Sequence, residues 1–122
     1  MEIGGKAILL KTDDVFRLFV LSASRRVDSA AIRRQLQAKK TRFASREELF
    51  GLTGLVPGSV PPFGSPILPF ELFVDPSILA NEKIAFNAGS LEVSIVMALP
   101  DYLRAAAPKI LAFSEAAEPS VV

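Results

Sequence analysis

The first third of the chain alternates apolar runs with short polar clusters in a way typical of strands. Apolar runs over 7–10 and 15–21 are rich in β-branched and aromatic residues, and the polar cluster 11–14 separates them. This pattern predicts two antiparallel strands joined by a turn. Arg17 interrupts the second run, so we expect its side chain to face solvent or a ligand groove.

Two short helices and one strand are predicted next. Asp28 is a candidate N-cap for a helix over 29–37, whose apolar residues lie four positions apart. A strand is predicted over 40–44. Ser45 and Glu48 have the spacing of a capping box, so a second helix is predicted to begin there.

The second half of the chain contains further strand-like runs. Strands are predicted over 67–74, 83–86 and 91–98. A short helical turn is predicted after Asp75, and Pro100 suits the first turn of a last helix.

These elements mix strands and helices without strict alternation, and neither a repeat nor a linker divides the chain. The sequence therefore predicts one α+β domain over residues 1–122, with a mixed, barrel-like β-sheet surrounded by helices. A C-terminal tail is expected from about 109 to 122, ending in a frayed segment over 118–122.

The composition of the chain excludes several kinds of catalytic and structural site. The chain has no Cys and no His, which excludes disulfides, thiolate nucleophiles, a Ser-His triad and a His general base. Its carboxylates lack the spacing of a calcium loop, so neither a metal nor another cofactor is expected. No apolar run is long enough to span a membrane, and we expect a cytoplasmic protein that contacts no membrane.

The net charge is +1, but its distribution is uneven. Basic residues outnumber acidic ones by seven up to Arg46, and acidic residues outnumber basic ones by six afterwards. Such a distribution suits a docking face for a polyanion, and it equally suits ordinary solvated surfaces.

The densest signal is the segment 51–66, which holds four Gly and four Pro. Gly allows close backbone approach, and Pro fixes φ and removes donors. We expect a stiff backbone surface that binds an anion or stabilises a developing oxyanion. The alternative is a rigid connection without chemistry.

Three motifs carry a family resemblance. The order Thr53-Gly54, Gly58 to Pro62, Phe63-Gly64 resembles the Gly-x-x-x-Pro loop of the YbaK and prolyl-tRNA-synthetase insertion-domain family. Residues 5–11 look like the strand that carries the family's functional lysine, and 39–49 resemble the strand and helix before the loop. The agreement runs from Lys6 to about Leu103.

The resemblance implies an aminoacyl-tRNA deacylase, which hydrolyses the ester of a mischarged tRNA with a positioned water, helped by a hydroxyl of the terminal ribose. The implied catalytic positions are Lys6, Gly58, Ser59 and Pro62. The implied aminoacyl-binding positions are Phe43, Thr53, Gly54, Val60, Pro61, Phe63, Gly64, Asn87 and Gly89. Phosphates of the acceptor stem are expected to meet the basic residues Arg17, Arg25, Arg26, Arg33, Arg34, Lys39, Lys40 and Arg42.

The leading hypothesis is therefore a trans-editing enzyme that removes alanine, serine, threonine or cysteine from a mischarged tRNA, with tRNA and an aminoacyl-tRNA synthetase as partners. One alternative is a non-catalytic module that binds tRNA or a synthetase. Another is a hydrolase that uses Ser59 as a nucleophile beside Lys6. Members of the resembled family have a helix and a strand before the lysine, so an N-terminally short domain with an open sheet edge is expected, and an open edge favours pairing with a second copy.

Overall fold

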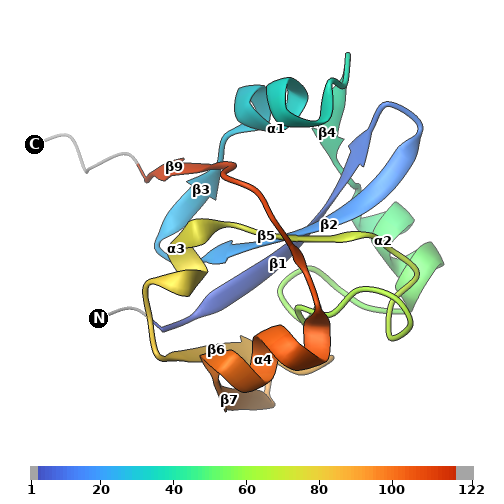
Figure 1. Cartoon of the computed structure of the whole chain (residues 1–122). Helices are drawn as coiled ribbons and strands as arrows, with labels where there is room; N and C mark the ends of the chain where they lie inside the picture. The colour runs from blue at the N-terminus through green and yellow to red at the C-terminus, as the bar shows by residue number, and fades with distance from the viewer. Residues whose placement is uncertain (1–2, 118–122) are drawn as a thin grey trace, which may run out of the picture.

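The first hairpin organises the sheet of this protein, whose computed structural model describes residues 3–117 (Figure 1). Strand β1 (Gly5–Thr12) pairs with β2 (Val15–Ser22) in antiparallel register along its whole length. The turn between them has two residues, and Asp13 adopts a φ of 52° there. The predicted hairpin is confirmed, with each strand slightly longer than expected.

A five-stranded sheet grows from this hairpin in the order β4-β1-β2-β5-β8. Strand β4 (Thr41–Phe43) is antiparallel to β1, whereas β5 (Leu72–Val74) and β8 (Lys109–Ile110) continue the sheet in parallel. The predicted mixed α+β fold is therefore confirmed.

The expected barrel-like closure is not confirmed. The remaining described strands form two separate ribbons beside the five-stranded sheet. One pairs β3 (Arg25–Val27) with β9 (Ser114–Ala116), and the other pairs β6 (Lys83–Asn87) with β7 (Ser94–Ala98).

The first three helices begin at capping side chains. Asp28 caps α1 (Ser29–Leu36), and the predicted capping box of Ser45 and Glu48 opens α2 (Arg46–Thr53). Helix α3 (Pro76–Leu79) is a single turn, and α4 (Leu99–Ala106) has Pro100 in its first turn. None of the helices within residues 3–117 has the length and apolar character needed to cross a membrane.

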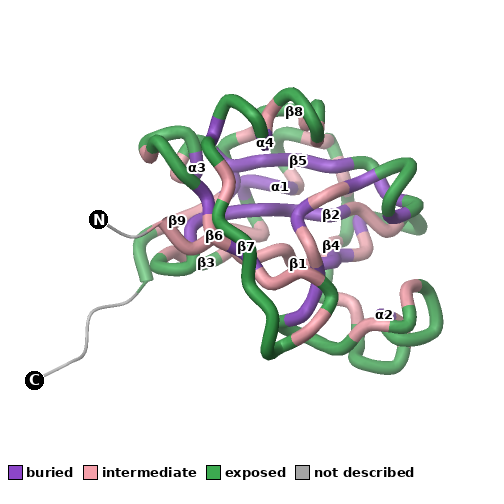
Figure 2. Tube along the Cα trace, turned by 90° about the horizontal axis from the view of Figure 1, so that it is seen from below, coloured by how far each residue is buried: buried purple, intermediate pink, exposed green. Residues whose placement is uncertain are grey.

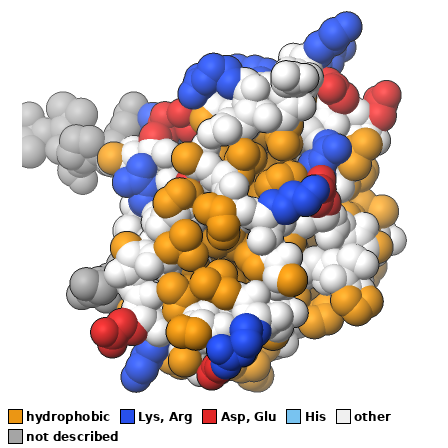
Figure 3. Space-filling view, viewed as in Figure 1, with side chains coloured by type: hydrophobic (Ala, Val, Ile, Leu, Met, Phe, Trp, Pro, Cys, Tyr) orange, Lys and Arg blue, Asp and Glu red, His pale blue; other side chains and the backbone are white. Residues whose placement is uncertain are grey.

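The two faces of the sheet pack against different layers. Leu10, Phe19 and Leu21 face α1, where Ile32 is fully buried. The alternate residues of β1 and β2 face the opposite layer, which holds Tyr102 of α4 and the β6–β7 ribbon (Figure 1). Figure 2 shows β2 and β5 buried between these layers. Figure 3 shows Lys and Arg side chains at the end of the molecule where α1 lies.

Two predicted strands are shorter than expected. The strand predicted over 67–74 covers only Leu72–Val74, because Pro66 and Pro69 cannot donate to a ladder. The strand predicted over 91–98 begins at Ser94, because the Ala88 N–H donates to the Val93 carbonyl and closes the hairpin loop there.

The segment after Pro108 is more regular than the expected tail. It supplies β8 to the large sheet and β9 to the ribbon with β3. Strands this short, β3 included, are too brief to show a periodic pattern of apolar residues. The frayed end predicted over 118–122 lies outside the described residues.

One buried carboxylate holds this last segment in place. Asp75, only 3% exposed, accepts hydrogen bonds from the Phe113 N–H (2.8 Å), the Ser114 N–H (3.0 Å), the Ser114 hydroxyl (2.7 Å) and the Ser77 N–H (2.9 Å). Burial raises the pKa of Asp75, but the four hydrogen bonds outweigh it and leave the pKa below its usual value. Asp75 thus joins β5, α3 and the C-terminal segment.

We expect Asp75→Asn to lower the free energy of unfolding by about 1–3 kcal/mol, because the amide has one acceptor oxygen where the carboxylate has two and lacks its charge. Urea denaturation measures this loss. The matched control is Asp101→Asn, whose carboxylate is exposed beside Arg104 and should matter by less than about 0.5 kcal/mol. Equal effects of the two substitutions would contradict the role given to Asp75.

The stability difference between the wild type and Asp75→Asn should also depend on pH. The unfolded carboxyl titrates near pH 4, and the folded one titrates lower. The stabilisation is therefore complete above about pH 4 and is lost as the pH falls through the folded pKa. Glu48 and Glu71, whose pKa values are also lowered, titrate in the same acidic range, so the difference between the two proteins isolates Asp75.

Candidate functional site

The Gly- and Pro-rich segment contains a tight turn over 56–59. The Ser59 N–H donates to the Val56 carbonyl (3.1 Å), Pro57 takes the second position, and Gly58 takes the third with a φ of 88°. These are the residues and the geometry of a type II turn. Ser59 is 1% exposed, and its hydroxyl donates to the Val56 carbonyl (2.7 Å) and accepts from the Val56 N–H (3.2 Å). Pro57 and these hydrogen bonds restrict the conformation of the turn.

The β6–β7 hairpin clamps this turn from one side. The Asn87 side-chain amide donates to the Gly58 carbonyl (2.6 Å), and the Gly89 N–H donates to the Ser59 carbonyl (2.8 Å). A Cβ atom on Gly58 would lie 3.1 Å from Cδ2 of Leu91. Asn87 and Gly89 therefore position the turn through hydrogen bonds.

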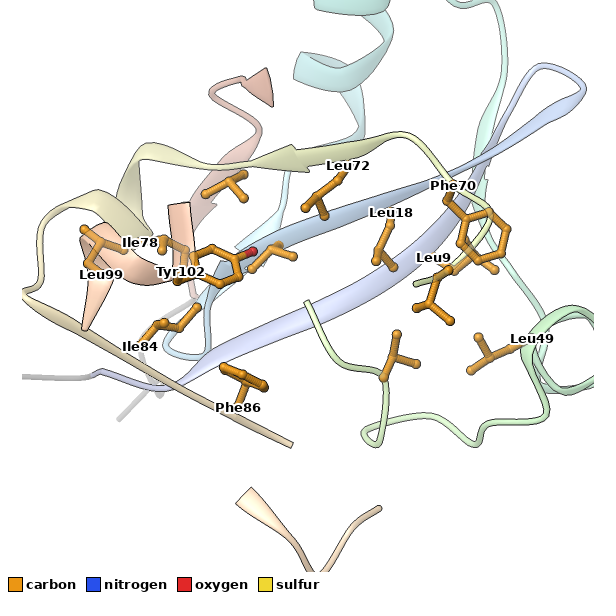
Figure 4. Packing of buried hydrophobic residues seen from close by; sticks show 14 residues of the cluster. Leu9, Leu18, Leu49, Phe70, Leu72, Ile78, Ile84, Phe86, Leu99 and Tyr102 are labelled. Carbon is orange, nitrogen blue, oxygen red and sulfur yellow. The ribbon is translucent and has the colours of Figure 1, made fainter. Parts of the chain in front are cut away.

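Two cavities meet at the turn. The first, which we name the Lys6 cavity, has a volume of about 230 Å³ and is lined by Gly5, Lys6, Ala7, Ala23, Gly58, Val60 and Asn87. The second, the Phe43 pocket, has a volume of about 210 Å³ and is lined by Ala7, Ile8, Leu9, Phe43, Ala44, Leu49, Pro57, Gly58 and Val60. Ala7, Gly58 and Val60 border both cavities. Figure 4 shows Leu9 and Leu49, which line the Phe43 pocket, at the end of the apolar core.

The free edge of β1 borders both cavities on the side opposite the Gly58 turn. The register Thr12↔Val15 around a two-residue turn directs the backbone groups of alternate β1 residues away from β2. Leu9 is one of these residues, and its carbonyl accepts from the Ala44 N–H (2.9 Å). Ala7 is another, and within residues 3–117 no backbone group pairs with its N–H or carbonyl. The backbone N–H groups of Gly58 and Val60 likewise have no acceptor in the described chain.

Among the described residues that line the first cavity, Lys6 is the only one with a charged side chain. It is half-buried at the start of β1, and no described acidic side chain forms an ion pair with its ammonium. An ammonium in this position attracts a phosphate or a developing oxyanion. The Phe43 pocket, by contrast, is lined by apolar side chains and glycine.

The structure brings together five of the positions expected to act on the substrate. Lys6, Gly58, Val60 and Asn87 line the Lys6 cavity, and Phe43 lines the neighbouring pocket. The sequence did not indicate three further lining residues, which are Ala7, Ala44 and Pro57. Their side chains carry no chemical signal, and only the strand register could have indicated Ala7.

The other expected aminoacyl-binding positions shape the loop and line neither cavity. Thr53 and Gly54 end α2, through the Thr53 hydroxyl bond to the Leu49 carbonyl and the φ of 74° at Gly54. Pro61 lies between the turn and the buried Pro62, whose carbonyl accepts from the Tyr102 hydroxyl (2.7 Å).

Phe63 and Gly64 continue this supporting role. The Phe63 ring packs edge-on against Phe86 and Tyr102, with centroids 5.7 and 5.4 Å away. At Gly64 a Cβ atom would lie 2.5 Å from the Phe70 carbonyl oxygen, so only glycine fits there.

None of the basic residues predicted to hold tRNA is among the described residues that line the two cavities. Four of them contact other side chains: Arg17 contacts Glu71, Arg25 contacts Ser114, Arg26 contacts Glu115 and Arg42 contacts Glu48. The Arg42 guanidinium donates two hydrogen bonds to the Glu48 carboxylate, and the Ser45 N–H donates a third. These hydrogen bonds lower the pKa of Glu48 to about 2. Arg33, Arg34, Lys39 and Lys40 belong to α1 and the loop after it, on the sheet face opposite the Gly58 turn.

Comparison with known proteins gives a consistent picture. Residues 3–105 match the family model described as the aminoacyl-tRNA editing domain. The chain is 33% identical over 120 residues to the multifunctional Ser/Thr-tRNA deacylase ProXp-y of Escherichia coli strain K12, covering 93% of this chain and 71% of that protein. It is 35% identical over 83 residues to the proline–tRNA ligase of Shouchella clausii, which covers 68% of this chain and 14% of the ligase.

The fold is also found among solved structures. A crystal structure described as "a putative trans-editing enzyme for prolyl tRNA synthetase" superposes with a TM-score of 0.83 at 22% identity, covering 93% of this chain and 71% of that one. This likeness shows the fold alone. The sequence matches confirm the resemblance drawn from the loop and lysine motifs, and with it the expected class of tRNA-editing enzyme. The chain belongs to the aminoacyl-tRNA editing domain family.

Proposed function

We propose that this protein is a trans-editing deacylase, which hydrolyses the ester between a small amino acid and the terminal ribose of a mischarged tRNA. The observation that carries the proposal is the meeting of the Lys6 cavity and the Phe43 pocket at the backbone of Ala7, Gly58 and Val60. Family membership and the deacylase relative support the same reaction.

The two cavities suit the two halves of the substrate. The amino-acid side chain enters the apolar Phe43 pocket, whose 210 Å³ suits a small group. The terminal nucleotide occupies the Lys6 cavity, where the ammonium attracts its phosphate. The ester then lies at the border, beside backbone N–H groups that have no acceptor within residues 3–117.

These N–H groups stabilise the oxyanion that forms during hydrolysis. Water attacks the ester carbonyl carbon, and the developing oxyanion accepts hydrogen bonds from backbone N–H groups of Gly58 and Val60. The bond between this carbon and the ribose oxygen breaks, and a proton from the water passes to the ribose oxygen. The products are the free amino acid and uncharged tRNA. A ribose hydroxyl orients the water, because none of the described residues that line the two cavities carries a carboxylate or an imidazole.

The burial of Ser59 disfavours the hypothesis that it is the nucleophile. Its hydroxyl is almost inaccessible, makes both of its hydrogen bonds with Val56 and lines neither cavity. A nucleophilic serine needs an exposed oxygen next to a base. We infer that Ser59 positions the turn instead.

The apolar pocket indicates how the enzyme selects its acyl group. It accepts a side chain by size, and it offers no side-chain hydrogen-bonding group to a hydroxyl. A pocket of this kind distinguishes alanine, serine, threonine and cysteine only weakly. Serine and threonine, the substrates named for the E. coli relative, are the first acyl groups to test.

Lys6→Ala is expected to reduce deacylation of tRNA charged with serine, threonine, alanine or cysteine by at least about a hundredfold, because without the ammonium the terminal phosphate is no longer fixed and the ester loses its position beside the N–H groups of Gly58 and Val60. Binding of tRNA should change only a few-fold, since Lys6 makes one phosphate contact. Lys83→Ala is the control, because Lys83 is exposed on β6 outside the cavity lining. Wild-type protein that binds tRNA but hydrolyses none of the four esters would support the non-catalytic module.

Gly58→Ala is expected to slow deacylation by about tenfold or more and to destabilise the fold by about 1–2 kcal/mol, since its φ is positive and the new Cβ crowds Leu91. Gly51→Ala is the matched control. It lies in α2 with no atom within 4 Å of the new Cβ, and should preserve activity while adding up to about 1 kcal/mol of stability. Rates and urea denaturation test both, and full activity of Gly58→Ala would contradict the role of the turn.

Ala44→Leu is expected to fill part of the Phe43 pocket. The kcat/KM for threonyl-tRNA should fall more than that for alanyl-tRNA, changing their ratio by about tenfold. Ala30→Leu is the control, because Ala30 is exposed on α1. An equal loss for both substrates would show that the side chain binds elsewhere.

A further inference from the structure

The most exposed apolar segment of the described chain is the β6–β7 hairpin. Leu91, Val93, Ile95 and Val96 are 62%, 54%, 42% and 57% exposed. Figure 2 shows β7 on the surface along its length. Four large aliphatic side chains within six residues are unusual at a water-exposed edge, which proteins normally protect with charged residues or proline.

Within residues 3–117, the backbone of β7 is also unpaired on one side. The Ala88 N–H donates to the Val93 carbonyl and the Leu99 N–H donates to the Glu82 carbonyl, which fixes the bonding pattern between β6 and β7. With this pattern the N–H and carbonyl groups of Ser94, Val96 and Ala98 point away from β6. The opposite edge of β6 is occupied, because the Ala85 N–H donates to the Ile3 carbonyl.

We propose that β7 is a self-association surface, on which two copies pair antiparallel about a two-fold axis at Val96. The outward-pointing residues are spaced symmetrically about this position. Val96 would pair with Val96 of the second copy, and Ser94 would pair with Ala98 of the second copy. Each edge group then finds a partner, and the two ribbons become one four-stranded sheet.

The side chains are self-complementary in the same register. Ile95 lies opposite Met97 of the second copy on the face directed toward the core, and Val96 meets its own counterpart on the outer face. No charged residue occurs within 93–98, so no like charges oppose each other across the strands. Hydrogen-bond spacing, side-chain size and charge thus all fit a second copy of this chain.

The mass in solution tests the proposal. Sedimentation equilibrium should show a rise from 13.1 kDa toward twice that mass as the concentration increases from low to high micromolar. Hydrogen exchange on the wild type identifies the surface: the amides of Ser94, Val96 and Ala98 should become protected over the same range. A monomer at every concentration would overturn the proposal, as would a dimer in which these amides remain unprotected.

Val96→Lys should weaken self-association by about a hundredfold or more, because it places two ammonium groups together at the axis. Val15→Lys is the matched control, because Val15 at the start of β2 is 49% exposed, close to the 57% of Val96. Circular dichroism checks that each variant folds. Should Val96→Lys fail to fold, Val96→Pro removes only the outward N–H, which β6 does not use, and should also dissociate the dimer. A dimer that survives these changes would contradict the proposal.

Discussion

The two edges of β1 have different partners, and the rest of the structure depends on this division. One edge pairs with β2 along its whole length, which fixes the register and the face of every core residue in the hairpin. The other edge pairs with β4 only over Leu10–Thr12. The remaining free edge, around Ala7, borders the space into which the Gly58 turn projects.

This division explains why the candidate site consists mostly of backbone. A strand edge and a turn with a positive φ both present N–H groups that the surrounding fold does not use. The hairpin that carries Asn87 holds the turn against this edge through two hydrogen bonds. Lys6 adds the single charge. The chain has no His and no Cys, and the proposed mechanism, with a positioned water and fixed N–H groups, needs no other titratable side chain.

Local signals in the sequence predicted most of the elements. The capping box of Ser45 and Glu48, the N-cap Asp28 and the hairpin act over a few residues, so the sequence alone shows them. The role of Asp75 in holding the C-terminal segment was not predicted, because its hydrogen bonds to Phe113 and Ser114 join residues 38 or 39 positions apart. The lengths of β5 and β7 were wrong because proline and the hairpin loop limit them.

The candidate site was predicted through its motifs rather than through its geometry. Lys6, Gly58 and Asn87 do lie together, whereas Phe63 and Gly64 pack behind the loop. A sequence motif cannot separate residues that touch a ligand from residues that hold the loop. The placement of the basic residues Arg33 and Arg34 could not be predicted either. Their helix, α1, packs on the sheet face opposite the turn, and no pattern along the chain reveals which face a helix covers.

The proposed position of the ester, between the Lys6 cavity and the Phe43 pocket, can be measured directly. The experiment is an NMR titration of the amide-labelled protein with a non-hydrolysable adenosine that carries threonine through a 3′-amide bond. We expect the largest shifts at the amides of Ala7, Gly58 and Val60, with smaller ones at Phe43 and Ala44. Shifts confined to α1 and the Lys39–Lys40 loop, with Gly58 unchanged, would contradict it.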